Sequence, residues 1–357
     1  MRRLLGVISL VTLVLAAGGT ARPAQAQSAD APPSLVQTPA VPQAAAFAGW
    51  LAAFKKEAAA QGIRPATIET ALANVQPVEK IIERDRSQSE FTLKFADYRD
   101  RVLTRTNIVA GQKMLTRYSP LLRAISKKYG VQPRFIVAIW GIETRYGAVK
   151  AATPVIPALA TLAFDGRRPE FFRNELMQAL FMLDKGYAQT GDLNGSWAGA
   201  MGQPQFMPST YMKFAQDWDG DGRRDIWNNP ADVFASIANF LASNGWSDAQ
   251  TWGRQVRLPA QISTAMPKMQ RTEKSGCRAM DQLSVPRHLK DWQVQGVRKA
   301  DGANLPGKDV LAALALPEAG GGPAFIVYGN YESILRYNCA HYYALTVGAL
   351  SDRIGGG

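Results

Sequence analysis

The stretch "FIVAIWGIETRYGAV", residues 135–149, places one acidic side chain in an otherwise apolar helical pattern. Ile136, Ile139, Trp140 and Glu143 fall at i, i+3, i+4 and i+7, so the carboxyl of Glu143 shares its helix face with large apolar side chains. Apolar surroundings and the negative end of the helix dipole both raise the pKa of a carboxyl. A carboxyl kept protonated near neutral pH can act as a general acid. The alternative is a core Glu satisfied by an Arg or a backbone donor.

The helix that positions Glu143 is expected to begin at Pro133, because the first helical turn does not need the N–H that proline lacks. Gly147 is the expected C-terminal stop, which gives a helix of roughly four turns. The carboxyl then lies in the last turn and points inward.

A second stretch, "GSWAGAMGQPQFMPSTYMKFA" at residues 195–215, is too rich in glycine for a plain helix and too aromatic for a linker. Sugars offer many hydroxyls and apolar C–H faces, so exposed backbone, amide side chains and flat aromatic rings suit an oligosaccharide groove. The alternative is a structural loop whose aromatic side chains fill the core. The chemically informative side chains are Trp197, Gln203, Gln205, Phe206 and Tyr211.

The stretch "DWDGDGRRDIWN" resembles a calcium-binding loop, with acids at positions one, three, five and nine and glycine at position six. Position eight is Arg224 where an apolar residue is usual, and position twelve is Asn228 where a bidentate Glu is usual. Asp232 lies further along and could substitute. Without a metal, the segment is expected to be an Asp/Gly turn paired to Arg223 and Arg224. The acids concerned are Asp217, Asp219, Asp221 and Asp225.

Tyrosines and a cysteine gather near the C-terminus in "YGNYESILRYNCAHYYAL", where aromatic spacing fits either a core helix or a ligand surface. Cys277 and Cys339 are the two cysteines, and an oxidising compartment would permit a disulfide between them. His288 and His341 lack partners at metal-ligand spacing. A zinc site or a Ser-His-Asp triad is therefore not expected, and the chemistry must rest on carboxylates, hydroxyls and amides.

The N-terminal segment reads as a secretory signal peptide over residues 1–26, with two arginines, a short apolar run and small residues before the cleavage position. No cysteine follows to accept a lipid, so we expect no stable membrane anchor; an uncleaved anchor is the competing interpretation. Residues 27–45 are expected to form a flexible tether. The net charge of +12 falls to about +9 without the leader. Such a chain favours polyanions such as cell-wall polymers, and no nucleic-acid motif is present.

Composition and periodicity divide the remaining chain into four parts. Residues 46–130 show helical patterns and are expected to form an N-terminal helical domain. Residues 131–250 contain the Glu143 helix and the possible calcium loop at 217–232. Residues 251–330 change to short runs such as "RQVRLP", "WQVQGVRKA" and "PAFIVYGN", which indicate a small subdomain with strands. Residues 331–357 return to helical spacing.

Taken in order, "GIETRYG", "GSWAGAMGQPQFMPSTY", "DGDGRRDIW", "ANFLASNGW" and "RYNCAHYYAL" resemble the membrane-bound lytic transglycosylase B family of bacterial cell-wall enzymes. The likeness runs from about residue 46 to the C-terminus. It implies a mainly α (α+β) class: a lysozyme-like helical catalytic core, an N-terminal helical domain, a small β subdomain, and a C-terminal helix that completes the core.

The resemblance also implies roles for particular residues. The single catalytic acid falls on Glu143, and a structural calcium ion is implied in the acidic loop. This chain departs from the family by an apparent insertion at residues 228–229, by Tyr146 in place of Trp, and by Phe240 in place of a groove Tyr. The implied glycan-binding residues are Tyr98, Ser196, Gln205, Phe206, Tyr337, Asn338 and Tyr343. The implied metal ligands are Asp217, Asp219, Asp221, Arg223 through its carbonyl, and Asp232.

The family resemblance implies cleavage of the β-1,4 bond between N-acetylmuramic acid and N-acetylglucosamine, with a 1,6-anhydro ring as product. No cofactor is required for that chemistry. Peptidoglycan strands are the expected partner, with wall-synthesis proteins as further partners and the periplasm as the expected location. Two alternatives stay open: a hydrolytic muramidase with Asp165 or Glu175 as second acid, and a non-catalytic glycan-binding scaffold. Endo- or exo-cleavage, stem-peptide requirement and oligomeric state do not follow from the sequence.

Overall fold

The computed structural model describes residues 41–87, 93–318 and 321–356. The expected signal peptide at residues 1–26 lies outside the described residues, as does most of the expected tether. Helix α1 (Val41–Ala60) begins inside the last part of that tether, so the prediction that the tether extends to residue 45 is wrong. The reason is local: a proline stands in the first turn of α1, and the alanine-rich sequence after it has high helix propensity.

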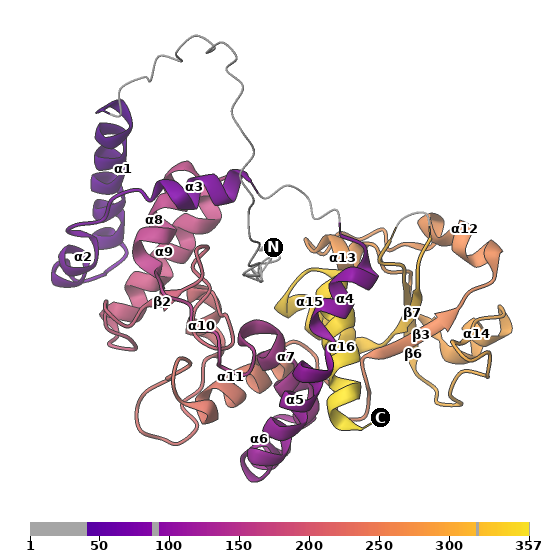
Figure 1. The fold of residues 1–357 in the computed structure, drawn as a ribbon. Helices are drawn as coiled ribbons and strands as arrows, with labels where there is room; N and C mark the ends of the chain where they lie inside the picture. The colour runs from indigo at the N-terminus through magenta and orange to yellow at the C-terminus, as the bar shows by residue number, and fades with distance from the viewer. Residues whose placement is uncertain (1–40, 88–92, 319–320, 357) are drawn as a thin grey trace, which may run out of the picture.

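One group of helices surrounds the antiparallel pair α8 (Val155–Asp165) and α9 (Pro169–Asp184). Helices α1, α2 (Pro65–Leu72) and α3 (Glu79–Arg86) pack against this pair, as Figure 1 shows for the indigo and magenta helices. The face of α8 that meets them is apolar and fully buried.

A second group surrounds α7 (Pro133–Thr144), whose residues from the third onward are all buried. Helix α16 (His341–Gly355) packs along α7, so segments about 200 residues apart in sequence lie side by side in space (Figure 1). The other helices in this group are α4 (Phe95–Val102), α5 (Arg105–Arg117), α6 (Ser119–Tyr129), α11 (Pro230–Ser243) and α15 (Gly329–Tyr337).

The third part of the fold is a five-stranded antiparallel sheet in the order β4-β6-β7-β3-β5. Its own apolar cluster contains Trp292, Leu314 and Ile326, and is separate from the main core. The strands are β3 (Gly253–Arg257), β4 (Arg287–His288), β5 (Arg298–Lys299), β6 (Leu311–Ala315) and β7 (Ala324–Val327). The accompanying helices are α12 (Ala260–Met269), α13 (Arg278–Asp281) and α14 (Leu289–Val294).

The expected mainly α (α+β) class is confirmed, and the strands of the sheet lie between residues 253 and 327. Within "WQVQGVRKA" the expected strand is wrong at its start, because Trp292 lies in α14 and only Arg298–Lys299 pairs as β5. The domain boundaries stay predictions. The packing divides residues 46–130 between the two helical groups, since α1–α3 contact α8 and α9 whereas α5 and α6 contact α7. None of the described helices combines the length and apolar character needed to cross a bilayer.

Candidate active site

Glu143 lies in the last turn of α7, which begins at Pro133 as predicted and ends at Thr144, three residues before the predicted stop at Gly147. The chain turns away through Arg145, Tyr146 and Gly147, all with left-handed φ angles of 51°, 60° and 79°. Such angles are unfavourable for residues with a Cβ atom, so tertiary contacts must hold them.

The contact that holds this turn is made by Tyr146. Its hydroxyl donates to the carbonyl of Asn107 at 2.8 Å. Its ring lies so close to Gly141 that a Cβ on that glycine would stand 2.4 Å from the ring. Tyr146 thus fixes the end of the helix that carries Glu143.

The carboxyl of Glu143 is buried, with 7% of the residue exposed. Tyr343 donates a hydrogen bond of 2.6 Å to its Oε1, whereas its Oε2 has no hydrogen-bond partner among the described residues. Burial raises the pKa of Glu143 to about 8, and the Tyr343 hydrogen bond opposes that rise only in part. The carboxyl is therefore protonated at neutral pH, as the sequence predicts. Its hydrogen-bond donor is a tyrosine, and not the arginine or backbone N–H expected for a purely structural core Glu.

Tyrosines from three elements surround this carboxyl. Tyr337, at the end of α15, stacks on Tyr343 with ring centroids 6.4 Å apart, and its hydroxyl donates to the carbonyl of Pro204 at 2.6 Å. Tyr98 of α4 lies beside Tyr342 at 5.9 Å. Burial raises the pKa of Tyr98 and of Tyr337, and the negative charge of Glu143 adds to both shifts. All three predicted tyrosines are thus within electrostatic reach of Glu143.

The glycine-rich stretch forms a tight turn beside these rings. Within it, Met201 forms isolated antiparallel bridges with Gly195 and with Phe206. The Ser196 hydroxyl accepts a hydrogen bond of 3.1 Å from the Ala200 N–H. Gln205 has a left-handed φ of 52° and donates its amide to a backbone carbonyl three residues earlier at 2.8 Å. Both side chains are half-buried, which leaves polar atoms for a ligand.

Phe206 takes a different position, because only 2% of it is exposed. Its ring packs against Phe240 and Tyr337 at 5.9 and 5.7 Å. It supports the tyrosines from within the core. Asn338 is also buried, in the short connection between α15 and α16.

Gln203 is a residue whose structural role the sequence does not indicate. Its Oε1 accepts a hydrogen bond of 2.6 Å from the Trp140 indole, and its Nε2 donates to the Trp227 carbonyl at 2.8 Å. Thr144 donates its hydroxyl to the Gln203 carbonyl at 3.1 Å. The amide therefore ties the last turn of α7 to the acidic loop. The sequence shows an amide side chain at Gln203, but it does not show that Trp140 is the hydrogen-bond partner of that amide.

The two candidate second acids have structural roles. Glu175 is buried and accepts hydrogen bonds of 2.9 and 2.7 Å from the backbone and hydroxyl of Ser209, in the first turn of α10 (Pro208–Phe214). Asp165 pairs with Arg86 at 2.7 Å. Burial raises the pKa of Glu143 without a contribution from another carboxylate of the described residues.

The acidic loop brings three of the predicted metal ligands together. One carboxylate oxygen from each of Asp217, Asp219 and Asp221 lies within 4.8 Å of the others. Backbone N–H groups of Gly220 and Gly222 donate to Asp217 at 2.7 and 2.9 Å. Gly222 adopts the left-handed φ of 84° that the sharp turn requires. This oxygen-only set fits a hard cation such as calcium.

Asp232 is buried at the start of α11 and holds the same loop through two hydrogen bonds. Its two oxygens accept N–H bonds of 2.8 Å from Trp218 and Asp225, which oppose the rise of its pKa to about 6 that burial causes. The apparent insertion is accommodated by Asn229, which caps α11 and donates to Asp219 at 2.8 Å. No described ion pair joins these acids to Arg223 or Arg224, so the expected Arg pairing of the loop is wrong.

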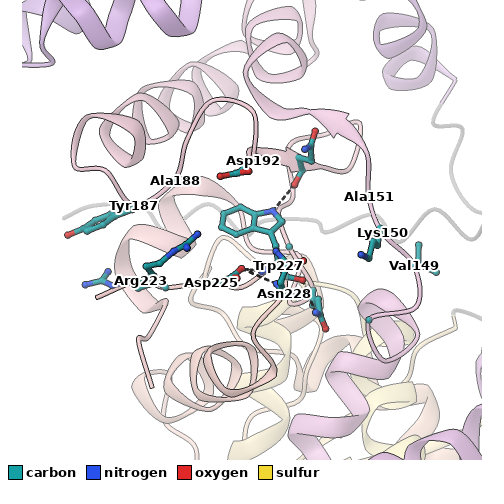
Figure 2. A pocket seen from close by; sticks show the side chains of 15 residues that line it. Val149, Lys150, Ala151, Tyr187, Ala188, Asp192, Arg223, Asp225, Trp227 and Asn228 are labelled. Carbon is teal, nitrogen blue, oxygen red and sulfur yellow. Dashed lines mark hydrogen bonds between the residues drawn. The ribbon is translucent and has the colours of Figure 1, made fainter. Parts of the chain in front are cut away.

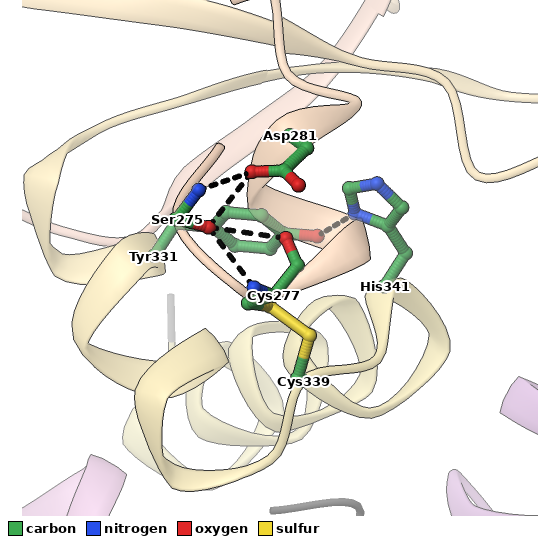
Figure 3. The surroundings of a disulfide bond; sticks show 6 residues. All are labelled: Ser275, Cys277, Asp281, Tyr331, Cys339 and His341. Atoms are coloured by element: carbon green, nitrogen blue, oxygen red, sulfur yellow. Dashed lines mark hydrogen bonds between the residues drawn. A yellow bond between two sulfur atoms is a disulfide. The ribbon is translucent and has the colours of Figure 1, made fainter. Parts of the chain in front are cut away.

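A disulfide between Cys277 and Cys339 joins the small subdomain to the connection that carries Asn338, with Cα atoms 5.6 Å apart (Figure 3). Beside it, a hydrogen bond of 2.8 Å links Tyr331 to His341, and burial lowers the pKa of that imidazole to about 4. The bond that an oxidising compartment would permit is therefore present, directly next to the site.

Replacing Tyr343 with Phe is expected to raise the pKa of Glu143 further, because the tyrosine hydroxyl stabilises the ionised carboxyl. The alkaline limb of the pH–kcat/KM profile should shift to higher pH, and kcat should fall about tenfold or more. Tyr342→Phe is the matched control, since its hydroxyl faces Glu318 at 3.3 Å. Identical pH profiles for both variants would contradict the assignment.

Comparison with known proteins defines the class of this chain. Residues 46–352 match the family model described as the transglycosylase SLT domain, and the chain belongs to that family. Membrane-bound lytic murein transglycosylase B of Escherichia coli (strain K12) is 34% identical over 261 residues, which are 72% of this chain and 66% of that protein. The match therefore spans just under two thirds of that relative's length.

Solved structures agree with this membership. SltB3 from Pseudomonas aeruginosa in complex with NAG-NAM-pentapeptide is 41% identical with a TM-score of 0.79, and covers 87% of this chain and 80% of its own. A complex of SltB3 with NAG-anhNAM-pentapeptide gives 40% and 0.78 over the same shares. Escherichia coli Slt35 in complex with calcium is 27% identical with a TM-score of 0.70, over 85% of this chain and 92% of its own. The expected lysozyme-like transglycosylase fold is confirmed.

Proposed function

We propose that this protein is a lytic murein transglycosylase that cleaves the β-1,4 bond between N-acetylmuramic acid and N-acetylglucosamine and leaves a 1,6-anhydro ring. The observation that carries the proposal is the buried, protonated carboxyl of Glu143, whose raised pKa involves no other carboxylate of the described residues. A hydrolase that activates water ordinarily needs a second carboxylate. The relative SltB3 binds both an anhydro and a non-anhydro muropeptide, which supports this reaction.

Glu143 supplies the proton and then takes one back. Its acid proton passes to the glycosidic oxygen as the bond from that oxygen to C1 of the muramic residue breaks. The carboxylate that forms keeps the 2.6 Å hydrogen bond from Tyr343. It then removes the proton of the C6 hydroxyl, whose oxygen bonds to C1 of the same sugar. This intramolecular attack gains effective concentration, so no water has to be activated.

The surrounding residues position the glycan. Ser196 and Gln205 have polar atoms at the half-buried turn beside the tyrosines and are suited to the acetamido and hydroxyl groups of the sugar. Tyr337, Tyr343 and Tyr98 form the wall next to the acid, and Asn338 adjoins them. Phe206 supports this wall from the core.

The acidic loop is proposed to hold a structural calcium ion through Asp217, Asp219, Asp221 and the Arg223 carbonyl, with Asp232 bracing the loop. When bound, the ion would offset two of the three negative charges of the clustered carboxylates. The residues fit, because their oxygens already converge, and a calcium complex of the relative Slt35 supports the choice of ion.

Calcium at millimolar concentration is expected to raise the melting temperature of the protein by several degrees, and a chelator is expected to reverse the rise. Asp219→Asn should remove the effect, since it withdraws one of the three clustered carboxylates. Differential scanning calorimetry with magnesium as the control ion measures this. A melting temperature independent of calcium would contradict the proposed site.

We place the enzyme in the periplasm, with peptidoglycan strands as its substrate and wall-synthesis proteins as further partners. The signal-like leader supports export, and the disulfide supports an oxidising compartment.

Mass spectrometry of muropeptides released from purified sacculi tests the proposed reaction. Anhydro-muropeptides, lighter than hydrated products by one water, are the expected result. Hydrated reducing ends would mean a muramidase. Sacculus binding without release would mean a glycan-binding scaffold. Either result would overturn the proposal.

A further inference from the structure

A cavity of about 260 Å³ is lined in part by the segment that follows α7 (Figure 2). Its walls come from residues of the segment 147–151 after α7, the segment 187–194 between α9 and strand β2 (Asn194–Gly195), the turn at Gln203, and the segment 223–228. Ligand pockets commonly measure roughly 300–1,000 Å³. This cavity has room for one or two amino-acid residues and is too small for a glycan strand.

Opposite charges face this cavity without neutralising one another. Lys150 lies on one side of Trp227, and Arg223 lies on the other side, with Asp192 nearby (Figure 2). In the described part of the chain, the side chains of Lys150, Arg223 and Asp192 form no ion pair or hydrogen bond. Arg224 lies over the Tyr187 ring at 4.8 Å, which holds its guanidinium at the rim. Both a carboxylate and an ammonium group would find a partner here.

The floor of the cavity is held in place by hydrogen bonds. The Trp227 indole donates to the Asn194 carbonyl at 3.0 Å, and Gln203 donates to the Trp227 carbonyl at 2.8 Å. The same Gln203 accepts the 2.6 Å bond from Trp140 of α7. The floor is therefore preorganised, which lowers the entropy that a ligand must lose on binding.

We propose that this cavity binds the charged end of a peptidoglycan stem peptide, a segment that carries both free carboxylate and ammonium groups. The inference rests on the proposed function and extends it to a peptide-binding site. The relative SltB3 has been captured with pentapeptide-bearing ligands. Gly147 lies on the cavity wall four residues after Glu143, so its Cα is at most about 14 Å from that of Glu143. An extended pentapeptide spans up to about 17 Å and can bridge that distance.

Calorimetric titration with the free stem pentapeptide tests the site independently of catalysis. Lys150→Ala and Asp192→Ala are each expected to weaken binding about five- to tenfold, and binding to the unaltered protein should weaken with added salt. Both residues are exposed, so the variants should fold. Lys290→Ala, an exposed cation on α14, is the matched control and should bind normally. Absent binding, or equal affinity in all four proteins, would overturn the inference.

Turnover of two substrates separates this inference from the proposed function. The substrates are a peptide-bearing glycan and the same glycan after enzymatic removal of its peptides. The ratio of their kcat/KM values should fall about five- to tenfold in Lys150→Ala, through KM, and should be unchanged in Lys290→Ala. An unchanged ratio in Lys150→Ala would overturn the peptide site. If the unaltered protein cleaved neither glycan, the proposed function would fail, and the calorimetry would still decide the cavity.

Discussion

Glu143→Gln is expected to lower the rate of glycan cleavage by roughly 10³-fold or more. The substitution keeps the shape of the side chain but removes the acid that donates the first proton and accepts the second. The same carboxyl serves both steps, and no other carboxylate of the described residues contributes to its raised pKa. Release of anhydro-muropeptides measures the loss, and retained binding to sacculi shows that the glycan-binding residues are intact. Turnover equal to that of the unaltered protein would remove Glu143 from the reaction.

The same substitution is expected to stabilise the fold, which provides an internal control. The pKa of Glu143 is about 8 in the folded chain and near its ordinary value of 4.5 in the unfolded chain. A raised folded pKa gives stability that is fully present below pH 4.5 and is lost as the pH rises through 8. Gln does not titrate, so the gain in unfolding free energy should be absent near pH 4 and on the order of 3 kcal/mol at pH 7. Urea unfolding at the two pH values measures it.

Replacing both cysteines, Cys277→Ser with Cys339→Ser, is expected to lower the free energy of unfolding by about 4 kcal/mol. The disulfide closes a loop with a sequence separation of 62, and opening it returns that conformational freedom to the unfolded chain. Both cysteines pack in or against the hydrophobic core, so the serine hydroxyls would also be placed among apolar side chains, which is unfavourable. Thermal unfolding with and without reductant measures the effect.

The loss of the disulfide is also expected to reach the active site. Cys339 follows Tyr337 and Asn338 directly, and α16 with Tyr343 begins two residues later. A looser connection would weaken the 2.6 Å hydrogen bond from Tyr343 to Glu143. The value of kcat should therefore fall, and the alkaline limb of the pH profile should shift to higher pH. Reductant should leave the double variant unchanged. If reductant altered the double variant as it alters the unaltered protein, the effect would not come from this disulfide.

The sequence indicates the position of Glu143 because a lone acid on an apolar helix face is visible as a pattern. The end of its helix is not visible, since Gly147 is the obvious stop and the left-handed Arg145 and Tyr146 are held by Asn107 and Gly141. Which groups meet Glu143 depends on long-range packing. The tyrosine-rich C-terminal stretch makes Tyr343 a candidate for either the core or a ligand surface, and its donation to the carboxyl follows from the packing of α16 on α7.

The sheet shows the same limit. The β-branched and aromatic run "AFIV" is a strand by local preference and forms β7. The run "LAALA" has helical propensity, yet it forms β6, because pairing with β4 and β7 buries four of its five residues. Glu175, a candidate acid by type, serves to bind the first turn of α10. Residue type alone makes both Glu143 and Glu175 candidate catalytic acids, and their tertiary contacts distinguish the catalytic candidate from the structural one.

The 200-residue separation between Glu143 and Tyr343 has a consequence for biosynthesis. The acid is synthesised 200 residues before its partner, so a chain interrupted between the two positions holds the acid without its hydroxyl donor. The acid and its hydroxyl donor therefore act together only in a chain that contains both α7 and α16.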